Sequence, residues 1–90
     1  MKTVRIIVSG RVQGVAFRMY TQHEARRLGV KGTVRNRANR EVEIVAEGED
    51  GPVDQLTRWA RQGPPAARVD GLRVEELPYE GTFEGFTIRH

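Results

Sequence analysis

The sequence has no cysteine, only two histidines and no long apolar run. Disulfides, thiolate metal sites and a cysteine nucleophile are therefore excluded. The two histidines, His23 and His90, are too few for a histidine-built zinc site, so we expect no metal. A membrane span would need roughly 20 consecutive apolar residues. Arg5 interrupts the apolar N-terminal run, which predicts a strand and no signal peptide.

The length of 90 residues leaves room for one domain, and we expect residues 1–90 to form it. Lysine and arginine number 15 against 12 acidic residues, giving a net charge of +3. Such a balance favours an anionic partner, which could be a phosphate ester, a nucleic acid or a membrane surface. The lack of cysteine fits a reducing, cytoplasmic setting.

The hydrophobic pattern predicts two helices and four or five strands. The strands are expected at residues 3–9, 30–36, 41–47, 68–77 and 83–89, and the helices at 18–28 and 53–62. This order, βαββαβ with a terminal or split strand, predicts an α+β two-layer sandwich of ferredoxin-like type. Its sheet should be mainly antiparallel, with both helices on one face. A fold that hosts many functions does not by itself indicate the chemistry.

The polar stretch Arg37–Arg40 predicts a hairpin turn between the two middle strands. Asn39 is the residue in this stretch that best tolerates a positive φ, so we expect the turn to place it there. Asn36, just before the turn, has the same parity as Val34 and should point to the same side of the strand.

The segment GRVQGVAFR, Gly10–Arg18, stands between the first strand and the first helix. Its glycines allow the backbone to curl, and amide N–H groups at a helix N-terminus can form an anion-binding nest. The guanidinium of Arg18 could place two donors on the same phosphate. The segment lacks the Gly-Lys-[Ser/Thr] of a P-loop and the third glycine of a dinucleotide fingerprint. An ordinary turn with a surface arginine has the same spacing.

GRVQGVAFR resembles the first signature of the acylphosphatase family at every fixed position. MYTQHEARRLGVKGTVRN and FEGFTIRH resemble further parts of that family, so the likeness covers nearly the whole chain. It implies that Arg18 is the substrate-binding arginine and that Asn36, eighteen positions later, is the catalytic asparagine. Thr33 and Arg40 depart from the family, which has an aromatic residue and a glycine there, and Arg40 raises the question of how the turn beside Asn36 is built.

The resemblance implies a small, free-standing hydrolase that cleaves the carboxyl–phosphate bond of acyl phosphates to a carboxylate and inorganic phosphate. It implies no metal and no cofactor. Asn36 would orient the water, and the phosphate would be held by Gln13, Gly14, Val15, Ala16, Phe17 and Arg18. The expected partners are a small-molecule acyl phosphate and, as product and inhibitor, inorganic phosphate or a similar anion. We expect a cytoplasmic monomer that binds neither nucleic acid nor membrane.

Three other readings share the fold. An RNA-binding module needs aromatic residues on its central strands, but the strand at 41–47 is acidic and has none. Acylphosphatase-like domains also occur within larger maturation proteins that handle carbamoyl phosphate. A regulatory anion-binding domain without turnover is the third possibility. A covalent route is not expected, because neither Ser9 nor Thr21 has an evident His–carboxylate partner.

The remaining polar residues are expected to lie at the surface. His23 falls away from the apolar stripe of its helix and should be solvated. A metal site is not expected on the acidic strand. Several basic residues flank the proposed site in sequence and could attract anionic substrates or simply keep the protein soluble: Arg11, Lys31, Arg35, Arg37 and Arg40.

Overall fold

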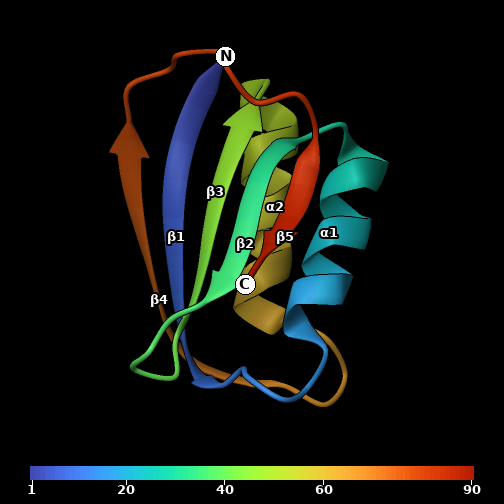
Figure 1. Ribbon diagram of the computed structural model, residues 1–90, viewed down its shortest axis with the longest axis vertical. Helices are drawn as coiled ribbons and strands as arrows, with labels where there is room; N and C mark the ends of the chain where they lie inside the picture. The colour runs from blue at the N-terminus through green and yellow to red at the C-terminus, as the bar shows by residue number, and fades with distance from the viewer.

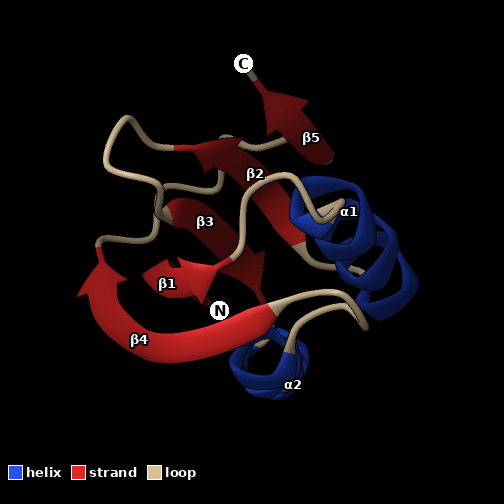
Figure 2. Ribbon diagram, turned by 90° about the horizontal axis from the view of Figure 1, so that it is seen from below, coloured by secondary structure: helices blue, strands red, loops and turns tan.

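The computed structural model describes residues 1–90, which form five strands and two helices. The elements are β1 (Lys2–Arg11), α1 (Phe17–Leu28), β2 (Lys31–Asn36), β3 (Val42–Gly48), α2 (Asp50–Gln62), β4 (Arg68–Leu77) and β5 (Phe86–Arg89). The sheet order is β4-β1-β3-β2-β5, and only the pairing of β2 with β5 is parallel. Both helices lie on one face of the sheet (Figures 1 and 2). The predicted ferredoxin-like architecture is confirmed.

The core lies between the sheet and the helices because every second strand residue points to the helical side. Val4, Ile6 and Val8 of β1 are all buried there. Phe17 at the start of α1 is only 2% exposed, and its ring lies 5.6 Å from that of Trp59 at an interplanar angle of 60°. Burying a side chain of this size contributes about 1.5–3 kcal/mol. The contact therefore fixes the start of α1 against α2.

The ends of two elements differ from the expected ones. α2 begins at Asp50 and not at Val53, since Pro52 is tolerated in the first turn, where its missing N–H would have had no helical partner. β5 begins at Phe86 and not at residue 83. The backbone N–H of Gly32 donates to the carbonyl of Gly85 at 2.9 Å, which ties the incoming chain to β2 just before the ladder begins.

The hairpin turn between β2 and β3 forms as predicted, but its positive φ was assigned to the wrong residue. Arg40 has a φ of 73°, whereas Asn39 does not have a positive φ. The Asn39 side chain accepts a hydrogen bond from the Glu41 N–H at 3.2 Å and donates one to the Glu41 carboxylate at 2.8 Å. These local bonds hold Asn39 outside the left-handed region and move that conformation one residue along the chain.

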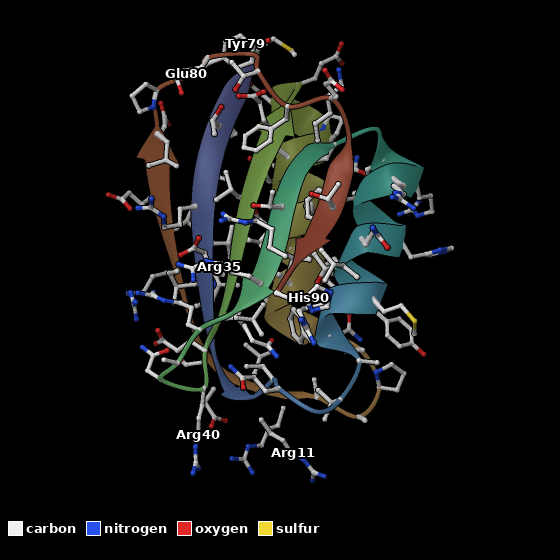
Figure 3. The ribbon with its side chains drawn as sticks, in the orientation of Figure 1. Arg11, Arg35, Arg40, Tyr79, Glu80 and His90 are labelled. Carbon is white, nitrogen blue, oxygen red and sulfur yellow. The ribbon has the colours of Figure 1, made fainter.

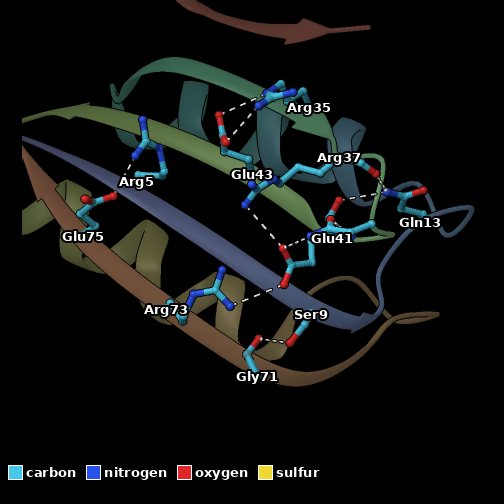
Figure 4. A network of polar contacts seen from close by, with 11 residues as sticks. Arg5, Ser9, Gln13, Arg35, Arg37, Glu41, Glu43, Gly71, Arg73 and Glu75 are labelled. Atoms are coloured by element: carbon cyan, nitrogen blue, oxygen red, sulfur yellow. Dashed lines mark hydrogen bonds and ion pairs between the residues drawn. The ribbon is translucent and has the colours of Figure 1, made fainter.

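The face of the sheet that lies away from the helices carries charged side chains that form several ion pairs (Figure 4). Four of the arginines on this face have a carboxylate partner at 2.8–3.5 Å. The pairs are Arg5–Glu75, Arg35–Glu43, Arg37–Glu41 and Arg73–Glu41. Most of the charge on this face is therefore held in ion pairs. No helix of the protein is long and apolar enough to cross a membrane.

Candidate functional site

A pocket of about 230 Å³ opens between the start of α1 and the ends of β2 and β5. Most of the predicted site residues line it, namely Gly14, Ala16, Phe17, Arg18 and Asn36. Its other walls are Val12, Met19, Ile88 and His90. The fold thus brings together an arginine from the first turn of a helix and an asparagine from the end of a strand, as the family resemblance implied.

The loop that leads into α1 has the backbone conformation of an anion nest. Gly14 and Ala16 both have positive φ, 75° and 62°, while Val15 between them does not. Such alternation turns successive N–H groups toward a common concave side. A Cβ on Gly14 would meet nothing within 4 Å, so glycine is favoured here by the positive φ and not by lack of space for a side chain. Ala16 at the N-cap position takes the left-handed conformation without being a glycine.

The amides of this loop have no partner within the protein. None of the nine backbone hydrogen bonds outside the helices and strands has its donor between residues 12 and 19. The first N–H groups of a helix never have intrahelical partners, and they carry the positive end of the helix dipole. The start of α1 therefore offers several unsatisfied donors beside the pocket, as anion binding requires.

Side chains of the loop anchor it to the rest of the fold. The Gln13 Nε2 donates to the carbonyl oxygens of Arg37 and Glu41, both at 2.9 Å, and so ties the loop to the hairpin turn (Figure 4). Val15 packs against the core, and Phe17 is buried in it. Gln13 and Val15 do not line the pocket with Arg18 and Asn36. Their side chains hold the loop in shape, and any contact with an anion falls to their backbone N–H groups.

The Arg18 side chain is half-buried at the mouth of the pocket and meets the end of the chain. Its Nη1 lies 3.5 Å from the Arg89 carbonyl oxygen and 3.3 Å from the His90 Nδ1. Figure 3 shows His90 beside the first turn of α1. These contacts aim the guanidinium at the pocket without neutralising it, because Arg18 has no carboxylate partner among the ion pairs of the protein.

His90 is a pocket residue that sequence reasoning missed. The parallel ladder pairs Val34 with Ile88 and Arg35 with Arg89. Extending that register by one residue places His90 opposite Asn36. The sequence predicts a last strand but not its partner, so only the sheet order reveals that this strand borders the site.

Asn36 is the last residue of β2 and pairs with Val42 of β3. Val34, two residues earlier, is fully buried on the helical side. Since Asn36 lines the pocket on that side, the expectation from parity is confirmed. Thr33 has the opposite parity and pairs with Val45 and Thr87. Its departure from the family pattern therefore lies on the other face of the sheet, away from the pocket.

Other candidate groups are engaged elsewhere. The Ser9 hydroxyl donates to the Gly71 carbonyl at 3.3 Å, and the Thr21 hydroxyl donates to the Phe17 carbonyl at 2.8 Å. His23 is exposed, as predicted. Lys31 occupies the opposite end of β2 from Asn36, so it does not flank the site in space. No group of three or more His, Asp and Glu side chains is placed to hold a metal ion.

The sequence model of the family described as Acylphosphatase matches residues 4–88. An acylphosphatase from Rubrobacter xylanophilus is 57% identical over 88 residues, which are 98% of this chain and 80% of the relative. An acylphosphatase from Anaeromyxobacter dehalogenans is 56% identical over 94% of this chain and 91% of its own length.

Solved structures show the same likeness. The crystal structure of acylphosphatase from Bacillus subtilis superposes with a TM-score of 0.96 at 37% identity, covering all of both chains. Full-length HypF, in a phosphate- and nucleotide-bound form, superposes with a TM-score of 0.90 at 28% identity. That match covers 99% of this chain but only 12% of HypF, so the same domain also occurs within a larger protein.

Proposed function

The chain belongs to the acylphosphatase family and hydrolyses acyl phosphates, and we propose that Arg18, Asn36 and the loop amides of residues 13–17 carry out this reaction without a metal ion. The observation that carries the proposal is the convergence of Arg18, Asn36 and the unpaired amides at the start of α1 on one pocket. These groups meet two requirements of phosphoryl transfer, a site for the phosphate and an oriented water.

The phosphate is held by the loop amides and by Arg18. The dianionic phosphoryl group enters the nest formed around Gly14 and Ala16, where the helix dipole also favours negative charge. The Arg18 guanidinium leaves its contacts with Arg89 and His90 and donates two hydrogen bonds to phosphate oxygens. In a loose, in-line transition state the same donors stabilise charge on the equatorial oxygens.

Asn36 orients the attacking water through its side-chain amide. An amide is too weak a base to remove a proton near neutral pH, so an oxygen of the substrate's own phosphate takes it. The leaving group is a carboxylate, which is stable as an anion and needs no strong general acid. The two nearby hydroxyls, of Ser9 and Thr21, donate to backbone carbonyls, which supports direct attack by water over a covalent intermediate.

The protein acts on a small molecule as one acylphosphatase-like domain, residues 1–90, and as a monomer in the cytoplasm. Two features favour a small-molecule substrate over RNA. Four arginines on the open face of the sheet are paired with glutamates. β3, in the middle of that sheet, carries no aromatic side chain on which a base could stack.

The phosphate site formed by Arg18 and the loop amides, called the cradle below, is tested by measuring phosphate binding and turnover in Arg18→Gln. Loss of the guanidinium group should abolish both turnover and competitive inhibition by inorganic phosphate, measured with chelator present throughout. Arg58→Gln is the matched control, because Arg58 is exposed on α2 and its substitution removes the same charge outside the pocket. If Arg18→Gln bound phosphate like the wild type, the assignment would be wrong. A wild type inactivated by chelator would refute the metal-free mechanism.

A further inference from the structure

A second groove lies beside the loop of residues 13–17, called the phosphate loop below, and three arginines line it. Its volume is about 570 Å³, and it is bordered by Gly10, Arg11, Val12, Gln13, Arg40, Arg68 and Asp70. Val12 also lines the pocket that holds Arg18 and Asn36, called the phosphate pocket below, so the two hollows share a wall. Figure 3 shows Arg11 and Arg40 extending from the same end of the molecule, where the phosphate loop lies.

The charge of this groove is not compensated. Arg68 is held by Asp70, with two contacts at 3.0 and 3.3 Å. Neither Arg11 nor Arg40 takes part in any ion pair of the protein. On the open face of the sheet, by contrast, four arginines have a glutamate partner. Two guanidinium groups beside the phosphate pocket therefore remain free to bind an anion.

The fold holds the backbone beneath these arginines in place. Arg11 pairs with Arg68 at the end of the β1–β4 ladder. The Arg40 N–H donates to the Arg37 carbonyl at 3.2 Å, and Gln13 ties the same turn to the phosphate loop. Arg40 keeps a φ of 73°, a conformation that costs a side-chain-bearing residue free energy. Residues held in such conformations concentrate at functional sites.

We infer that this groove is a subsite for a negatively charged acyl group, so that the preferred substrates are acyl phosphates with a second anionic group, such as a distal carboxylate. The inference rests on the proposed function, because the phosphoryl end must occupy the cradle of Arg18 and the loop amides. The acyl part then passes the shared wall at Val12, and Arg40 and Arg11 meet its far anion. A neutral acyl group gains nothing from these side chains.

The test compares succinyl phosphate, whose acyl group ends in a carboxylate, with benzoyl phosphate, whose acyl group is uncharged. The measured quantity is the ratio of their kcat/KM values in Arg40→Gln and in the charge reversal Arg40→Glu. Lys31→Gln and Lys31→Glu are matched controls, because Lys31 is exposed, unpaired and at the opposite end of β2. Any change in the turn beside Asn36 affects both substrates and cancels in the ratio.

Arg40→Gln should lower the succinyl-to-benzoyl ratio about two- to fivefold, and Arg40→Glu should lower it further, to about a tenth of the wild-type value. The Lys31 variants should leave the ratio unchanged, and high salt should reduce the effect of Arg40. If both Arg40 variants kept the wild-type ratio while hydrolysing benzoyl phosphate, the subsite would be refuted and the hydrolase would stand. A wild type that hydrolysed neither substrate would refute the proposed function itself.

Discussion

Replacing Arg40 with glycine should stabilise the protein, because Arg40 holds a φ of 73° without being a glycine. For a residue with a Cβ the left-handed conformation costs about 1–2 kcal/mol. Glycine also gives the unfolded chain more conformational entropy, which lowers the free energy of unfolding by about 0.4–1 kcal/mol and so opposes this stabilisation. The Arg40 side chain is exposed and forms no ion pair, so its loss costs little. The net gain is about 0.5–1 kcal/mol, or roughly 2–8 °C in Tm for a domain of this size.

Urea unfolding of the wild type, Arg40→Gly and Arg40→Ala separates the contributions. Alanine removes the guanidinium but keeps the strained backbone, so the difference between the two variants isolates the conformation. Arg40→Gly should be the most stable of the three proteins. If it were no more stable than Arg40→Ala, strain at this turn would be refuted. If Arg40 also serves the proposed subsite, Arg40→Gly should gain stability and lose preference for a charged acyl group.

Two further predictions concern stability. Gly32→Ala should destabilise the fold by about 3 kcal/mol or more, since Gly32 has a φ of 139° and a Cβ there would overlap the Val45 carbonyl oxygen. Urea unfolding compares this variant with Gly85→Ala, where a Cβ meets nothing within 4 Å. Equal stabilities of the two variants would contradict the prediction. A hydrogen bond from Arg27 holds the pKa of Glu24 below its ordinary value of 4.5, so this pair stabilises the fold at neutral pH and ceases to do so as the pH falls through the lowered pKa. Glu24→Gln should therefore be less stable than the wild type near neutral pH and equal to it in strong acid, and a pH-independent difference would refute this linkage.

The first strand could be predicted from the sequence because its apolar alternation is unbroken. Val4, Ile6 and Val8 alternate strictly, and all three are buried on the helical side. Gly29 ends α1 with a φ of 74°, and its N–H donates to the carbonyls of Ala25 and Arg26, as its position after the last turn indicates. The start of α2 was less predictable, since Gly51 and Pro52 are poor helix formers that the first turn nevertheless tolerates.

The candidate site was only partly predictable. The glycines of the phosphate loop predict a turn, but nothing about an alanine predicts the left-handed conformation of Ala16. Gln13 belongs to the same motif, yet its side chain binds two carbonyls of a hairpin 24 and 28 residues away. His90 reaches the pocket through a parallel pairing that no local pattern specifies. These features depend on contacts between distant segments, which one sequence does not encode locally.

The hydrolysis of benzoyl phosphate in the presence of chelator, followed by ultraviolet absorbance, tests the central claim most directly. The proteins compared are the wild type, Asn36→Ala and the control Gln55→Ala, which removes an exposed side-chain amide on α2, outside the pocket. We predict rapid turnover by the wild type and the control and a loss of about a hundredfold or more in Asn36→Ala, with phosphate inhibition largely retained. Full activity in Asn36→Ala would contradict the proposed role of Asn36 and with it the mechanism.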